Sequence, residues 1–196
     1  MPSLIRNFQD EITKQLKSIY PSVDIKTEWS AFRNERRLYS PRIDVAVGPF
    51  SIEHGNSCTK KYNSLMESSK SFIEMLLLFH QDNIKDNSIG DSQLYQPKTF
   101  DELMKFNKNA RCLLAIEVEN KGSRKHLLGS AVNAAALGRL GIVVGWAQEN
   151  VKALVKLQAY WEYLRSVDKN TYNTKNLIIL SPDQLRKAIS ASRHRR

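Results

Sequence analysis

The chain has 196 residues, of which 41% are hydrophobic and 26% charged, and its formal net charge is +10. This length and composition are typical of one folded domain and exclude a disordered or fibrous chain. The excess of positive charge favours a polyanionic partner, and nucleic acid is the first candidate. The two cysteines, Cys58 and Cys112, have no spacing that indicates a zinc site or a disulfide framework.

Neither a membrane span nor a secretion signal is predicted. The most apolar stretch, residues 72–79, is interrupted by Glu74 and is much shorter than the roughly 20 residues that cross a bilayer. The N-terminus lacks the continuous apolar region of a signal peptide. We therefore expect a cytoplasmic protein with no membrane partner.

The first half of the chain predicts two helices with a strand between them. Apolar residues recur at helical spacing over 4–19, and Ser3 precedes them as a cap. Residues 43–47 alternate in the strand period. A second helix is expected over about 63–81, and the polar segment 82–98 predicts a surface loop.

The second half predicts alternating helices and strands. The capping-box spacing of Thr99 and Glu102 opens a short helix to about residue 107. An apolar run over 112–116 continues into Glu117-Val118-Glu119 and predicts a central strand. The elements that follow are a helix rich in small residues after Ser123, a strand at 141–146, a helix at 149–165, a strand at 176–180 and a helix at 182–190. Trp146, Tyr160 and Trp161 have core spacing and are interpreted as packing residues.

Strand, helix and strand in this order imply a parallel crossover connection. The pattern therefore predicts a single α/β domain over residues 1–196, with a mixed sheet flanked by helices. A helical and loop insertion is expected at about 55–108.

Acidic and basic side chains alternate at the end of the predicted central strand. Residues two apart in a strand point to the same face, so Glu117, Glu119 and, if the strand continues, Lys121 project together. Adjacent buried acids need a compensating cation, and Mg²⁺, which prefers oxygen ligands, is the natural candidate. Asp44, on the other strand, could supply a further carboxylate. The alternative is a pattern that faces solvent at a strand edge and binds nothing.

Together these residues resemble the PD-(D/E)XK nuclease superfamily, which includes type II restriction enzymes and Holliday junction resolvases. Pro41-Arg42-Ile43-Asp44 stands where that family has its Pro-Asp element, and residues 116–121 stand where it has the acidic-x-Lys strand. The resemblance covers about residues 41–181. It implies a restriction-endonuclease-like three-layer fold with a central mixed β-sheet, although the separation of the two strands exceeds the short hairpin common in the family.

Two registers of the acidic strand fit this resemblance. In one, Glu119 and Lys121 are the family's acid and lysine. In the other, Glu117 and Glu119 are the pair, with a glutamate in the lysine position. We favour the second register, because Glu117 follows the apolar run immediately and Lys121 stands beside Gly122, where the strand should end.

The resemblance implies a metal-dependent DNA endonuclease that hydrolyses phosphodiester bonds with Mg²⁺, or with Mn²⁺ as a substitute. Asp44, Glu117 and Glu119 would hold the metal with the carbonyl group of Val118, and Lys121 would polarise the nucleophile or steady the phosphate. A homodimer is also expected, because cutting both strands of a duplex needs two sites. The alternative is a catalytically silent nucleic-acid-binding or assembly protein on the same fold.

Two further sets of residues are candidates for the same site. The family often carries a glutamate on its first helix that reaches the metal, and Glu11 is the candidate here. The alternative is an ordinary exposed glutamate. Ser123, Arg124 and Lys125 begin the helix after the acidic strand, where backbone amides and two cations could hold a phosphate. The alternative is a basic first turn on a solvated face.

Overall fold

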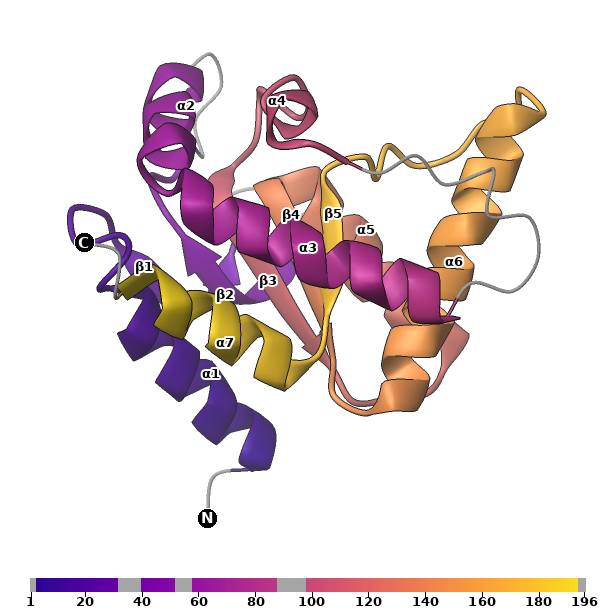
Figure 1. Cartoon of the computed structure of the whole chain (residues 1–196), viewed down its shortest axis with the longest axis horizontal. Coiled ribbons are helices and arrows are strands. Elements are labelled where there is room, and N and C mark those ends of the chain that lie inside the picture. Colours follow the sequence, from indigo (N-terminus) through magenta and orange to yellow (C-terminus); the bar gives the residue numbers. More distant parts are fainter. Residues whose placement is uncertain (1–2, 32–39, 52–57, 88–97, 194–196) are drawn as a thin grey trace.

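A five-stranded mixed sheet forms the centre of the molecule in the computed structural model, which describes residues 3–31, 40–51, 58–87 and 98–193 (Figure 1). The strands are β1 (Ile25–Ser30), β2 (Arg42–Val47), β3 (Cys112–Glu119), β4 (Gly138–Gly145) and β5 (Leu177–Leu180). The helices are α1 (Leu4–Leu16), α2 (Thr59–Ser68), α3 (Lys70–Asn87), α4 (Phe100–Leu103), α5 (Arg124–Leu137), α6 (Gln148–Ser166) and α7 (Pro182–Arg193).

The strands lie side by side in the order in which they occur in the chain. β1 and β2 pair antiparallel, as do β2 and β3, whereas β3, β4 and β5 are parallel. The helices α5 and α6 connect the parallel strands, as the predicted strand-helix-strand order requires. Between β2 and β3 the chain forms α2, α3 and α4 in the region of the expected insertion, of which residues 88–97 lie outside the described residues.

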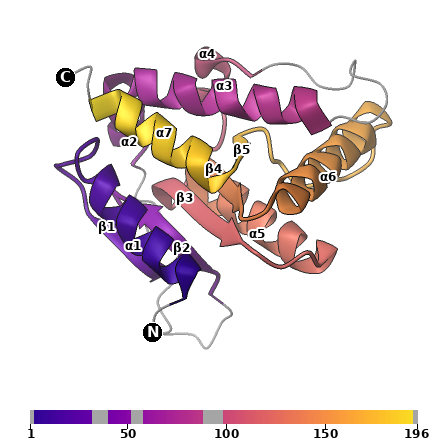
Figure 2. The same ribbon diagram turned by 60° about the horizontal axis from the view of Figure 1, so that its bottom comes forward.

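Helices cover both faces of the sheet, which gives three layers (Figure 2). One hydrophobic cluster joins the sheet to α1, α2, α3 and α7, and a second cluster joins the opposite face to α5 and α6. Successive residues of β4 alternate between the clusters, so that Val144 belongs to the first and Val143 to the second. Because both faces are covered, β3 and β4 are buried along their whole lengths and their sequences are almost continuously apolar.

The backbone of α5 lies unusually close to β4. A Cβ atom added to Gly141 would lie 2.6 Å from the carbonyl carbon of Ala134, a separation at which one of the two must move. Ala131, Ala134 and Ala135 on the inner face of α5 are buried. Small side chains on both sides therefore allow this contact, as the sequence of the helix predicts.

Three expectations about elements were wrong in detail. The single helix expected over 63–81 is two helices, α2 and α3, which are separated at Ser69. The second of these continues to Asn87, into the segment expected to be a loop. The edge strand β1 was not predicted, because its alternation of apolar and polar residues is short and weak.

Within the described ranges, no helix is both long and apolar enough to span a membrane.

Lys98 is a buried lysine that links α3 to β5. Its Nζ donates to the carbonyl oxygen of Leu177 at 2.7 Å and lies 3.5 Å from Nε2 of His80. The other ring nitrogen of His80 accepts from the backbone N–H of Ile179 at 3.1 Å. Burial lowers the pKa of Lys98 to about 7 and lowers the pKa of His80 well below its usual range. Both side chains are therefore favoured in their neutral forms in the folded protein.

Removal of the Lys98 amine should change how stability depends on pH. The folded pKa of about 7 lies below the usual 10.5, so the unfolded chain binds more protons between these values and the lysine's contribution to the free energy of unfolding rises with pH there. In Lys98→Met this rise should be absent, whereas Lys85→Met, at an exposed position of α3, should retain it. Urea unfolding across this pH range measures the difference, and identical pH profiles for the wild type and Lys98→Met would contradict the expectation.

Candidate active site

Asp44 and Glu117 meet where the pairing of β2 with β3 ends. The last paired residues are Val45 and Ile116, and Asp44 and Glu117 are the next residues on each strand. The backbone N–H of Val118 donates to Oδ2 of Asp44 at 2.7 Å, and the backbone N–H of Asp44 donates to the Glu117 carboxyl group. The two carboxyl groups are also in hydrogen-bond contact with each other. The strands therefore hold the two acids against each other through reciprocal backbone hydrogen bonds.

Burial gives this pair of acids an unfavourable electrostatic environment. Only 6% of Glu117 is exposed, and burial together with the adjacent Asp44 carboxylate raises its pKa well above the usual value. Burial also raises the pKa of Asp44, against the opposing effect of the Val118 N–H. Within the described part of the chain, neither acid forms an ion pair with a lysine or arginine. The pair therefore has a deficit of positive charge that a bound cation would correct.

Glu119 ends β3 and is held by two hydrogen bonds of its own. Its Oε1 accepts from the backbone N–H of Lys121 at 2.8 Å, and its Oε2 accepts from Oγ of Ser130 on α5 at 3.1 Å. Its side chain is buried, and its charge contributes to the raised pKa of both Asp44 and Glu117. Glu119 therefore acts electrostatically on the pair, while its carboxylate is anchored to α5.

Lys121 lies beyond the end of the strand. β3 stops at Glu119, so the strand does not carry Lys121 onto the face that Glu117 and Glu119 share. Its carbonyl oxygen accepts from Nδ2 of Asn150 at 3.2 Å, and its side chain is exposed without an ion pair among the described residues. Lys121 therefore does not project from β3 beside Glu117 and Glu119.

The remaining candidates lie at different places around the acids. Glu11 forms a two-point ion pair with Arg186 of α7, with Nε to Oε1 and Nη2 to Oε2 both at 3.0 Å. It is therefore held by α7 and makes no described contact with Asp44 or Glu117. Ser123 stands at the N-cap of α5 without a side-chain capping bond, and Arg124 and Lys125 are exposed beside it.

Sequence reasoning missed Gln9, which contacts the site from α1. Gln9 is 4% exposed, and its side chain hydrogen-bonds to the Asp44 carboxyl group. It lies one residue after Phe8 and three before Ile12, which are both buried. Its position beside the apolar stripe of the first helix indicates burial but does not show that it contacts Asp44, and the analogy to a family glutamate pointed to Glu11 instead.

The donor set fits Mg²⁺ or Mn²⁺ better than a metal that needs a closed protein cage. No group of three or more His, Cys, Asp or Glu side chains in the described ranges is arranged to hold a metal ion. The expected three-carboxylate group is thus reduced to a contacting pair, Asp44 and Glu117, with Glu119 nearby. Mg²⁺ is commonly held by one or two carboxylates with water completing its coordination, whereas structural zinc needs four protein ligands.

The chain matches no protein-family model, no curated protein and no solved structure at a significant level. The resemblance to PD-(D/E)XK nucleases therefore rests on the motif residues of the sequence alone.

Glu117→Gln should stabilise the metal-free protein at neutral pH. A carboxyl group whose pKa is raised by folding binds its proton more tightly in the folded state, so its contribution to stability falls as pH rises above the usual 4.5. Glutamine keeps the shape of the side chain and cannot ionise. We expect a higher midpoint of thermal unfolding in EDTA for Glu117→Gln and no such increase for Glu67→Gln, at an exposed position of α2. A lower midpoint for Glu117→Gln would show instead that the charged carboxylate is stabilised by the fold.

Proposed function

We propose that this chain is a Mg²⁺-dependent nuclease that hydrolyses phosphodiester bonds in DNA, with a fold of the restriction-endonuclease type. The observation that carries the proposal is the contact between the carboxyl groups of the partly buried Asp44 and the buried Glu117, which has no lysine or arginine counter-charge within the described residues. The net charge of +10 favours a polyanionic substrate. The two acids that lack a counter-charge are also the residues that stand in the order of the family motif, on neighbouring strands.

Each residue of the site has a distinct role in this proposal. Asp44 and Glu117 would hold the metal ion, which would supply an activated water molecule and neutralise charge on the phosphate. Gln9 and the N–H of Val118 fix the orientation of the Asp44 carboxylate. Ser130 fixes Glu119 beside the pair, where its carboxylate adds to the local negative charge.

Basic groups at the edge of the site would position the substrate. The ammonium group of Lys121 is exposed and has no ion-pair partner among the described residues, so it is available to a phosphate. Arg124 and Lys125 follow at the start of α5 and carry charge of the same sign. A homodimer belongs to the same proposal.

The alternative is a nucleic-acid-binding protein of the same architecture that does not cut. It is favoured by the lack of a group of three metal-ligating side chains within the described part of the chain. Its binding would use the same basic surface, so measurements of DNA binding alone do not separate the two functions.

Cleavage should depend on the metal and on the acidic pair. We expect the wild type to cut supercoiled plasmid or circular single-stranded DNA in Mg²⁺ and not in EDTA. Asp44→Asn and Glu117→Gln should each reduce the rate by a factor on the order of 10² or more, because each removes a carboxylate that would hold the metal ion, and the metal ion neutralises charge on the reacting phosphate. Glu67→Gln is the matched control. Cleavage that persists at the wild-type rate in both site variants would refute this active site.

Metal binding can be measured separately from cleavage. Mg²⁺ or Mn²⁺ should raise the midpoint of thermal unfolding of the wild type, because a ligand that binds the folded state stabilises it. The increase should be smaller in Asp44→Asn and Glu117→Gln. An absence of any metal effect in the wild type, together with intact DNA binding, would favour the function without cleavage.

The register of the motif determines which neighbouring residue matters most. If Glu117 and Glu119 are the pair, Glu119→Ala should slow single-turnover cleavage severely, Lys121→Ala should cost little, and Glu119→Lys should retain some activity. If Glu119 and Lys121 are the pair, Lys121→Ala should reduce the rate by on the order of 10²-fold and Glu117→Ala should be mild. Single-turnover rates at saturating Mg²⁺ decide between the two patterns.

A further inference from the structure

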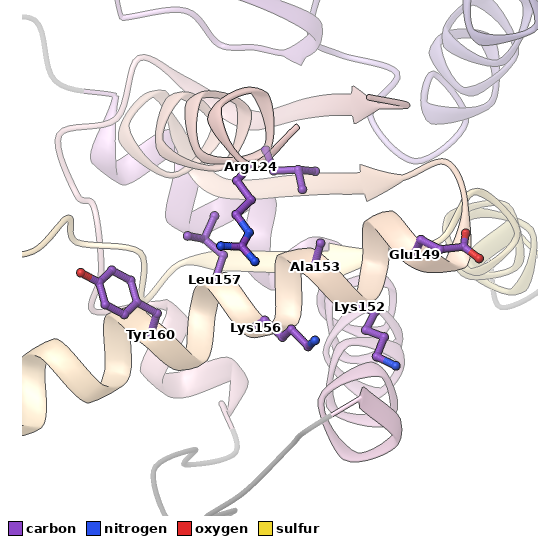
Figure 3. A pocket seen from close by; sticks show the side chains of 8 residues that line it. Arg124, Glu149, Lys152, Ala153, Lys156, Leu157 and Tyr160 are labelled. Atoms are coloured by element: carbon purple, nitrogen blue, oxygen red, sulfur yellow. The ribbon is translucent and has the colours of Figure 1, made fainter. Parts of the chain in front are cut away.

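A groove of about 630 Å³ runs between the start of α5 and the outer face of α6. Its floor is apolar, with Leu127, Ala153 and Leu157, of which Leu127 is 1% exposed. Figure 3 shows Arg124 extending from α5 toward α6 between Leu157 and Ala153. The groove thus has a hydrophobic base that a charged side chain crosses.

The rim of this groove carries an excess of positive charge. Arg124, Lys152 and Lys156 line it together with one acid, Glu149. Among the described residues, none of these three cations forms an ion pair, although the structure pairs other arginines with acids at distances as short as 2.5 Å. Cations that line a hollow without protein partners are complementary to an anionic ligand.

An exposed aromatic ring lies at one end of the groove. Tyr160 was expected to pack in the core, but 55% of its surface is exposed and it lines the groove at the end opposite Glu149 (Figure 3). Trp161, the next residue, is buried instead. From Glu149 to Tyr160 the helix advances by roughly 16 Å, at 1.5 Å per residue. The lining therefore alternates cations with apolar surface over about three helical turns.

The Glu149 end of the groove adjoins the acidic site. α6 begins after β4, whose last residue, Gly145, is paired with Glu119. The backbone N–H of Trp146 donates to the carbonyl oxygen of Glu119 at 2.9 Å, and Asn150 donates to that of Lys121. Hydrogen bonds therefore connect the end of β3 and the loop after it directly to the segment that begins α6 and the groove.

We infer that this groove binds an unpaired nucleic-acid strand and leads it to the carboxylates, so that single-stranded DNA, rather than intact duplex, is the substrate of the proposed nuclease. The inference rests on the proposed function. In a duplex the base faces are stacked on each other, and only the charged backbone could meet this surface. An unpaired strand offers phosphates to Lys152 and Lys156 and base faces to Tyr160 and the apolar floor, which is the combination of contacts that single-strand binding proteins use.

The binding test uses fluorescence anisotropy in EDTA, so that no cutting occurs. The probes are fluorescein-labelled oligothymidylate and a labelled duplex of the same length. The double variant Lys152→Ala/Lys156→Ala should weaken binding of the single strand by on the order of tenfold and should make the log–log dependence on salt shallower by roughly 1.4, about 0.7 for each phosphate that is no longer neutralised. Lys85→Ala/Lys187→Ala removes the same charge from exposed positions outside the groove and is the control.

The aromatic contact has its own pair of variants. Tyr160→Ala should weaken binding of the single strand by on the order of tenfold, because it removes the ring on which one base stacks, and Tyr160→Phe should bind like the wild type. Tyr163→Ala, 52% exposed on the same helix but outside the lining, is the control. Binding of the duplex should change little in either Tyr160 variant.

The outcomes separate this inference from the proposed function. A wild type that does not bind oligothymidylate, or groove variants that weaken binding of the two probes equally, would overturn the single-strand inference. Glu67→Gln, which lies outside both the groove and the acidic site, should bind like the wild type in EDTA. If the groove variants weaken single-strand binding but the wild type shows no metal-dependent cleavage, the nuclease proposal is rejected and the groove remains a single-strand binding site. If the wild type cleaves DNA and no groove variant affects cleavage, the groove inference is rejected and the nuclease proposal remains.

Discussion

Close packing of α5 against β4 is the constraint that positions both the anchor of Glu119 and the groove beside α6. The contact exists because Gly141 has no side chain and Ala134 has a small one, and an added Cβ would lie 2.6 Å from the helix backbone. With α5 at this distance, the hydroxyl group of Ser130 reaches Glu119, and Arg124 at the start of the helix lies over the groove. A larger residue at position 141 would have to move α5, and both the acids and the groove would lose part of their lining.

The acidic pair shows a compromise between stability and chemistry. Asp44 and Glu117 would be better replaced by apolar residues if the sheet only had to fold, because burial raises the pKa of both and no described basic side chain pairs with either. The surrounding structure nevertheless fixes the orientation of the Asp44 carboxyl group through Gln9 and the backbone of Val118. Electrostatic destabilisation of this kind, in side chains that hydrogen bonds orient, is typical of functional sites, where a bound ligand compensates for it.

The sequence predicted the parts of this structure that depend on local periodicity. β2, β3 and the helices that cross between parallel strands were found because alternation and apolar runs directly reflect burial on one or both faces. The role of Gln9 could not be found in this way, because it depends on the docking of α1 beside a strand more than thirty residues away, which no pattern within the helix encodes. Tyr160 was misplaced for a related reason. It precedes Trp161 by one residue, or about 100° around the helix, and spacing alone did not show which of the two rings faces the core.

Asn150 joins the two halves of the candidate machinery through a single amide group. Its Oδ1 accepts from the backbone N–H of Ala147 at 3.0 Å, and its Nδ2 donates to the carbonyl oxygen of Lys121 at 3.2 Å. The first turn of α6 and the loop after β3 therefore cannot shift independently without breaking one of these bonds. If a strand lies in the groove, its distance from the acids is set by this rigid connection. The cleavage position would then lie at a fixed distance from the nucleotides bound in the groove, independent of the base sequence of the strand.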